Sequence, residues 1–178
     1  KLTVPLLWAF GLGRAGQTYI FEHDGAFYES RVSFFDAVQG LDLTMGAQNS
    51  QPKSLEDAAG RRMDPNGARD CFGCHSTGGI EKAALHLETL SPGVGCEACH
   101  GPAGKHASAM RSGTTAGVQM RSLANLTTEE MSDLCGVCHR TWSQIAMRGP
   151  QGVYNVRFQP YRLTNSKCYD AVDRRIRC

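Results

Sequence analysis

The hydrophobic and polar positions of this 178-residue chain contain few long amphipathic periods, and the clearest pattern lies in residues 17–35. Two short runs there are rich in aromatic and β-branched residues, and they flank the pair Asp24-Gly25. An Asp-Gly pair between two such runs is a strong hairpin signal, because both residues tolerate the positive φ of a tight turn. We therefore expect two short strands, forming a small β element near the N-terminus.

Helical signals are short and local. Thr127 and Glu130 have the spacing of a capping box, so they predict a helix that starts there and continues through His139. Residues 81–90 predict a second short helix.

The other segments favour irregular structure. Residues 46–70 are polar, and residues 101–117 contain four glycines, so both are expected to be loops. Residues 91–95, Ser-Pro-Gly-Val-Gly, predict a turn.

The pentapeptide Cys-x-x-Cys-His occurs three times between residues 71 and 139. This pattern is the attachment site of c-type haem, in which two thiols add across the porphyrin vinyl groups and the imidazole of the adjoining histidine binds the iron. The predicted haem-attachment residues are Cys71, Cys74, Cys96, Cys99, Cys135 and Cys138, and the predicted proximal iron ligands are His75, His100 and His139. The sequence therefore predicts three covalently bound haem c groups in a multihaem cytochrome.

Three other uses of paired cysteines explain the pattern less well. A tetrahedral zinc site would use two of the three pairs, leave one over, and give no reason for a histidine after every second cysteine. A disulfide scaffold is compatible with the even count of eight cysteines but also ignores the histidines. A thioredoxin-type motif normally occurs once, beside a βαβ pattern that is missing here.

Composition agrees with a fold built around cofactors. Aromatic residues are only 8% and there are 20 glycines, while each haem supplies buried apolar surface of its own. We expect a fold that is mainly irregular with short α-helices, organised around the haems, with the small β element near the N-terminus. Residues 1–70 are expected to form a β/loop region that packs on the haem core, and residues 71–178 the multihaem region.

Charge and hydropathy bear on location. The net charge of +2 is too small to indicate binding to nucleic acid or to an anionic membrane. No run of 18 apolar residues exists, so no transmembrane segment is predicted. Because bacteria attach haem to such motifs outside the cytoplasm, we expect a periplasmic or extracellular protein.

Each iron also needs a sixth ligand or an open position. Three histidines lie outside the motifs, namely His23, His86 and His106, which would allow two histidines on every iron. His106 follows a glycine-containing spacer that could carry it to a neighbouring haem, and His86 lies on the expected helix. His23 lies beside the predicted turn, where a surface histidine is the plainer interpretation. Methionine is an alternative ligand, and none of the six is assigned.

Two cysteines remain, Cys168 and Cys178. They could form a disulfide in an oxidising compartment. Alternatively, Cys178 is the first cysteine of a further motif that continues beyond this sequence.

Residues 93–106 and 165–169 resemble a family of bacterial multihaem c-type cytochromes. The family includes the tetrahaem cytochromes associated with hydroxylamine oxidation and larger relatives that carry tetratricopeptide repeats. In that family, a histidine shortly after the motif Cys-Glu-x-Cys-His-Gly-Pro-Gly is a distal iron ligand. The resemblance implies the same role for His106. The chain departs from the motif at Ala103, where the family often has a glycine directly after the proline. The resemblance also implies further haem motifs beyond both ends of this chain. Ligands from those segments would replace His23 and His86 more readily than His106.

Electron transfer is the function that these features favour, because short spacers between motifs bring haems close together. The expected partners are redox proteins, with other cytochrome subunits as a further option. One alternative is a haem redox enzyme, which needs one open iron and neighbouring acid–base groups; no lysine-terminated motif or catalytic cluster indicates one. Another is a subunit of an extracellular cytochrome filament or of a larger redox complex.

Overall fold

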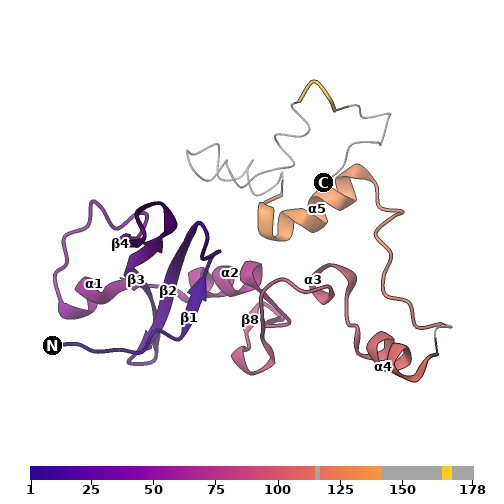
Figure 1. The fold of residues 1–178 in the computed structure, drawn as a ribbon, viewed down its shortest axis with the longest axis horizontal. Coiled ribbons are helices and arrows are strands. Elements are labelled where there is room, and N and C mark those ends of the chain that lie inside the picture. Colours follow the sequence, from indigo (N-terminus) through magenta and orange to yellow (C-terminus); the bar gives the residue numbers. More distant parts are fainter. Residues whose placement is uncertain (115–116, 142–165, 170–178) are drawn as a thin grey trace. The chain divides into compact units, whose positions relative to one another are not determined.

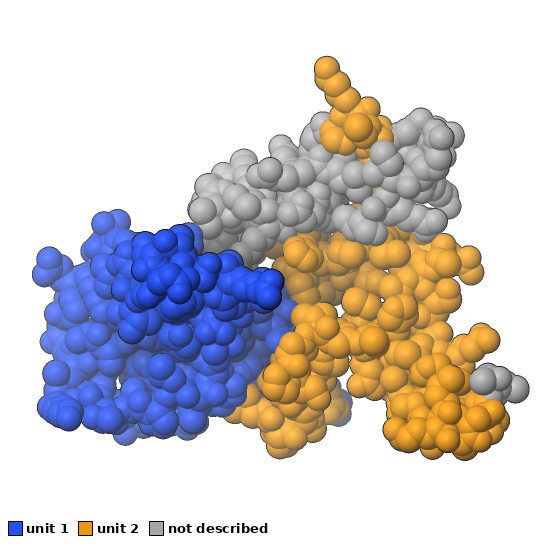
Figure 2. Space-filling model, in the orientation of Figure 1, with its two compact units in different colours: residues 1–75, 82–85 blue, residues 76–81, 86–178 orange. Residues whose placement is uncertain are grey.

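The computed structural model describes residues 1–114, 117–141 and 166–169. The chain divides into two compact units, residues 1–75 with 82–85, and residues 76–81 with 86–178 (Figure 2). The first haem motif therefore belongs to the same unit as the N-terminal residues. Within the described residues, no helix combines the length and the apolar character needed to cross a bilayer.

An antiparallel sheet lies in the N-terminal unit (Figure 1). Four strands lie in the order of the sequence, and a fifth pairs with the other end of the third strand. The strands are β1 (Trp8–Phe10), β2 (Gly16–His23), β3 (Ala26–Phe35), β4 (Gly40–Leu43) and β5 (Gly60–Arg62).

The predicted hairpin is confirmed. β2 and β3 pair with His23 opposite Ala26, and the turn residues Asp24 and Gly25 have φ values of 50° and 69°. The sheet is larger than the small element expected, because three short strands that lack a clear pattern of their own add hydrogen bonds to this long hairpin. A 3₁₀ turn, η1 (Asp36–Val38), joins β3 to β4.

Aromatic rings attach helix α2 (Pro65–His75) to this sheet. Phe72 is 1% exposed, and its ring lies 5.3 Å from that of Trp8, 5.1 Å from that of Phe10 and 5.9 Å from that of Phe27. The contacts with Trp8 and Phe10 are edge-to-face, a geometry that the ring quadrupoles favour. A variable position of the first haem motif is thus part of the hydrophobic core.

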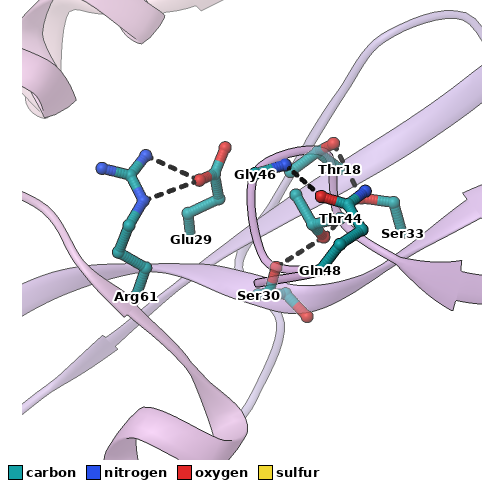
Figure 3. A network of polar contacts seen from close by, with 8 residues as sticks. All are labelled: Thr18, Glu29, Ser30, Ser33, Thr44, Gly46, Gln48 and Arg61. Atoms are coloured by element: carbon teal, nitrogen blue, oxygen red, sulfur yellow. Dashed lines mark hydrogen bonds and ion pairs between the residues drawn. The ribbon is translucent and has the colours of Figure 1, made fainter. Parts of the chain in front are cut away.

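A chain of hydroxyl groups crosses the same sheet (Figure 3). The Thr44 hydroxyl donates to the Ser30 carbonyl at 2.7 Å, so the Ser33 hydroxyl must donate to Thr44 Oγ1 at 2.7 Å. The Thr18 hydroxyl then donates to Ser33 Oγ at 2.8 Å. These hydroxyls, of which those of Ser33 and Thr44 are buried, satisfy one another and join β2, β3 and the end of β4.

The prediction that residues 46–70 form a loop is wrong for its second half. Helix α1 (Leu55–Ala59) and the start of α2 lie there. Ser54 caps α1 by accepting a hydrogen bond from the Asp57 amide, and the Asp64 carboxylate accepts two amide hydrogen bonds at the start of α2. The polar residues that indicated a loop are here the residues that begin helices.

The second unit contains short elements. β6 (Ser76–Thr77) pairs with β9 (Ser91–Pro92), so the predicted turn at residues 91–95 is confined to Gly93–Gly95. The predicted helix over residues 81–90 is wrong, because Lys82 and Ala83 both have positive φ. The segment instead contains β7 (Ile80–Glu81), β8 (Ala84–Leu85) and the 3₁₀ turn η2 (Leu87–Thr89).

Three α-helices follow, α3 (Glu97–His100), α4 (Gly104–Ser112) and α5 (Thr128–His139). Helix α4 contradicts the predicted loop over residues 101–117, since the four glycines of that segment lie at the ends of the helix or outside it. Gly113, for example, has φ 73° and forms its C-terminal cap. The capping box of α5 at Thr127 and Glu130 is confirmed.

Candidate haem-attachment sites

Each Cys-x-x-Cys-His motif forms the end of a helix. Helices α2, α3 and α5 end at His75, His100 and His139, respectively. Residues at positions i, i+3 and i+4 share one face of a helix, so the two thiols and the imidazole of the first and third motifs face the same side. In the second motif Cys96 is the N-cap residue of α3, and its φ of −56° and ψ of −36° continue the helical spacing by one residue. That arrangement suits two thioether bonds and one axial ligand on a single porphyrin.

The first motif lies against the N-terminal sheet. Cys71 packs on the core residues Ile20, Met63 and Ala68. Burial, together with the Glu29 carboxylate, raises the pKa of the Cys71 thiol.

The imidazole of the first motif is also in contact with the sheet. The ring of His75 meets the ring of Phe10 edge-to-face at 5.5 Å. Strand β1 therefore restricts the orientation of the proximal histidine predicted for this motif.

The second motif is more open, and Cys96 and Cys99 are exposed thiols. The loop before it is held by Thr77, whose hydroxyl donates to the Gly93 carbonyl at 2.9 Å and accepts from the Gly95 amide at 2.8 Å. These bonds fix the chain where it enters α3.

His100 makes two contacts with one distant residue. Its Nδ1 lies 2.8 Å from the carbonyl oxygen of Arg121, and the Arg121 amide donates to the His100 carbonyl at 3.3 Å. Since a carbonyl oxygen only accepts, Nδ1 carries the proton and Nε2 keeps its lone pair. A metal-binding histidine typically has this arrangement.

The third motif lies at a sharp change of chain direction. Arg140, directly after His139, has φ 70°. A Cβ atom added at the buried Gly136 would lie 2.8 Å from Thr141 Cγ2 and 3.2 Å from Thr141 Cα. The first variable position of this motif therefore has no space for a side chain, whereas in the first motif it holds Phe72.

Two of the remaining histidines also present Nε2. His106 is on helix α4, and its Nδ1 lies 3.0 Å from the Val118 carbonyl oxygen. His86 lies just before η2, and its Nδ1 lies 2.9 Å from a carboxylate oxygen of Glu88. The pKa of Glu88 is lowered by a backbone hydrogen bond and by this contact with His86. Both imidazoles are oriented by partners on Nδ1.

His23 differs from these two. It ends strand β2, and its Nε2 lies 3.6 Å from a carboxylate oxygen of Asp24. Its ring tilts against that of Tyr28 at 6.3 Å. In His23 the Asp24 carboxylate therefore lies beside Nε2, whereas in His86 and His106 the hydrogen-bond partner lies beside Nδ1.

A zinc site is not formed by the described cysteines. Across residues 1–114, 117–141 and 166–169, no group of three or more His, Cys, Asp or Glu side chains is placed to hold a metal ion. A structural zinc ion needs four such ligands around one point. Haem does not, because the porphyrin supplies four of the six iron ligands.

Cys168, the described member of the last cysteine pair, is an exposed thiol. It lies in a turn beside Tyr169, whose hydroxyl donates to a Glu129 carboxylate oxygen at 3.3 Å. Cys178 lies outside the described residues, so the proposed disulfide stays a prediction.

Comparison with known proteins finds similarity to c-type cytochromes. Residues 30–101 match the model of the family described as cytochrome c554 and c-prime. The chain is 27% identical to cytochrome c-554 of Nitrosomonas europaea over 128 residues, which is 66% of this chain and 53% of that protein. It is also 27% identical to the multiheme cytochrome MtrA of Shewanella baltica over 93 residues, 48% of this chain and 27% of MtrA. These matches support a multihaem c-type cytochrome family for the chain.

The chain spans about half the length of cytochrome c-554 and about a quarter of MtrA. No solved structure matches it significantly. Similarity to c-type cytochromes implies covalently bound haem c, and the residues present fit that group. Each motif offers two cysteines and a histidine at helical spacing, with Cys96 as the N-cap residue of α3, and His100 offers an imidazole whose Nδ1 is already bonded to a carbonyl.

Sequence reasoning missed the residues that hold this cytochrome's motifs in place. Phe72 and Gly136 occupy variable positions, and nothing in Cys-x-x-Cys-His distinguishes a buried variable residue from an exposed one. The carbonyls of Val118 and Arg121 carry no signal at all, because every residue has a backbone carbonyl.

Proposed function

We propose that this cytochrome is an electron carrier that binds three haem c groups, one at each Cys-x-x-Cys-His motif. The observation that carries the proposal is that all three motifs end a helix at their histidine, with the cysteines at helical spacing from it and Cys96 as the N-cap residue of α3. Cys71 and Cys74, Cys96 and Cys99, and Cys135 and Cys138 form the thioether bonds. His75, His100 and His139 are the proximal ligands.

The haem iron supplies the redox chemistry by alternating between the ferric and ferrous states. The residues of this chain hold the axial imidazoles and set the environment of the iron. A histidine bonded through Nδ1 to a neutral carbonyl, such as His100, is less basic than one bonded to a carboxylate, such as His86. The two arrangements therefore favour different reduction potentials.

We propose His106 and His86 as distal ligands, since both present Nε2 while a partner holds Nδ1. His23 is the weakest of the three candidates, because Asp24 faces its Nε2. Histidine on both sides of an iron leaves no position for a substrate, which suits electron transfer more than catalysis.

The partners in this proposal are redox proteins that give and receive single electrons, with other cytochrome subunits as a further option. The proposed location is the periplasm or the cell exterior, where haem is attached to such motifs in bacteria. Short spacers between motifs keep the haems close enough for electrons to pass from one to the next.

Haem content and open coordination positions test the proposal. The chain is produced in a host with cytochrome c maturation and examined by intact mass and the pyridine haemochrome assay. We expect a mass increase of three haems and no shift of the reduced spectrum with carbon monoxide. A carbon monoxide shift would favour a redox enzyme with an open site, and a defined large assembly in size-exclusion chromatography would favour a filament or complex. Absence of haem would overturn the proposal.

A further inference from the structure

Two histidines on different helices are bonded to the same short stretch of backbone. His100 Nδ1 lies 2.8 Å from the Arg121 carbonyl oxygen, and His106 Nδ1 lies 3.0 Å from the Val118 carbonyl oxygen. The Arg121 amide also donates to the His100 carbonyl at 3.3 Å. Residues 118–121, hereafter the orienting segment, therefore contact both imidazoles.

These contacts set the state of both rings. A carbonyl oxygen accepts and never donates, so each ring holds its proton on Nδ1 and presents Nε2 as the nitrogen able to bind iron. A hydrogen bond to Nδ1 also fixes the rotation of the ring and raises the basicity of the ligand nitrogen. Moving the acceptor therefore changes both the orientation and the donor strength of the imidazole.

The two rings belong to separate parts of the chain. His100 ends helix α3, and His106 lies on α4, with only residues 101–103 between the two helices. The four residue steps from His100 to Gly104 span at most about 14 Å even when fully extended. That connection is too short to pass around the edge of a porphyrin attached to α3 and place His106 on its opposite face.

We propose that the orienting segment positions axial ligands of two different haems, His100 as the proximal ligand of one and His106 as the distal ligand of another. This inference rests on the proposed function, since it requires His106 to bind iron. One four-residue segment then adjusts the environment of two irons together. A displacement of the segment weakens both Nδ1 hydrogen bonds, lowers the basicity of both imidazoles and moves both reduction potentials in the positive direction.

The test inserts one glycine between Gln119 and Met120 in the haem-loaded protein. The insertion changes the spacing between the carbonyls of Val118 and Arg121, so they no longer meet both rings at once. We expect two of the three midpoint potentials to rise in a spectroelectrochemical titration. The electron paramagnetic resonance signals of two ferric haems should change as well.

A matched control inserts one glycine between Gly117 and Val118, just outside the orienting segment. A Cβ atom at Gly117 would meet nothing within 4 Å, and an insertion at this point keeps the spacing of the two carbonyls. We expect the potentials of this control to equal those of the parent. A second variant, Arg121→Pro, removes the amide that donates to the His100 carbonyl together with the arginine side chain, and it should shift one haem.

The variant His106→Ala separates the two proposals. If His106 binds iron, its loss opens one haem to carbon monoxide while the haem count stays at three. Suppose that His106→Ala opens a haem, but the insertion between Gln119 and Met120 shifts the potential of no haem or of only one. That result would overturn the role of the orienting segment and leave the proposed function standing. No carbon monoxide binding by His106→Ala would remove the basis of this inference, and loss of all haem from the parent would refute the proposed function itself.

Discussion

Replacing Phe72 by alanine removes the side chain that attaches the first haem motif to the N-terminal sheet. Phe72 is 1% exposed and contacts the rings of Trp8, Phe10 and Phe27. Truncation of a buried phenylalanine costs about 3–5 kcal/mol, which combines lost transfer free energy with the cavity left behind. Two edge-to-face contacts are lost as well, so we expect a cost near the upper end, about 4–5 kcal/mol.

The free energy of unfolding is measured by guanidinium denaturation of the haem-loaded protein, followed by far-ultraviolet circular dichroism. The cysteines and histidines are unchanged, so the haem content of Phe72→Ala should equal that of the parent. Phe72→Leu keeps most of the apolar volume and should cost less than about 1.5 kcal/mol.

Val137→Ala is the matched control, because Val137 also occupies a variable position of a haem motif but is 70% exposed. Its cost should be below about 0.5 kcal/mol, as is usual for exposed side chains. If Phe72→Ala and Val137→Ala have equal stability at equal haem content, Phe72 does not attach the motif to the sheet and the reasoning is refuted.

Three further predictions concern single groups. Gly136→Ala should lower the melting temperature, because the added Cβ would press against the chain just after α5. Gly104→Ala, whose Cβ would meet nothing within 4 Å, should leave the melting temperature unchanged or raise it slightly. Equal effects of the two substitutions would contradict this steric argument. In the haem-free chain, the raised pKa of Cys71 should make its alkylation by iodoacetamide at pH 8 slower than that of exposed Cys96, as followed by peptide mass spectrometry. Because the folded pKa is raised, that chain should also lose stability as the pH rises from the ordinary thiol value of about 8.5, and a rise in stability would be the opposite of our expectation. Glu88→Gln removes a carboxylate from a proposed distal histidine, so one midpoint potential should rise in spectroelectrochemistry; unchanged potentials would argue against that histidine as a ligand.

The local signals in the sequence predicted the structure well. The turn pair Asp24-Gly25 predicted the hairpin of β2 and β3, because the preference for positive φ at those positions belongs to the residues themselves. Thr127 and Glu130 predicted the start of α5 for a similar reason, since the capping box joins groups three residues apart.

The wrong predictions came from composition taken without position. The glycines of residues 101–117 indicated a loop, yet they lie around the ends of α4. Polar residues 46–70 also indicated a loop, although Ser54 and Asp64 are helix caps. In residues 81–90 a helix was expected, and the positive φ of two consecutive residues prevents it. Composition does not say whether a glycine or a serine interrupts a helix or ends it.

By itself, the sequence determined which groups are available for haem attachment, namely two cysteines and a histidine within each of three pentapeptides. Where such a pentapeptide is helical, these groups share one face, because helix geometry is local. Only the tertiary structure decided how those groups are held. It buries Phe72 under three rings, leaves Val137 exposed, and brings the carbonyls of residues 118–121 to two imidazoles that lie well away from them in the sequence. A backbone carbonyl is the same in every residue, so its choice as a partner depends on the path of the chain alone.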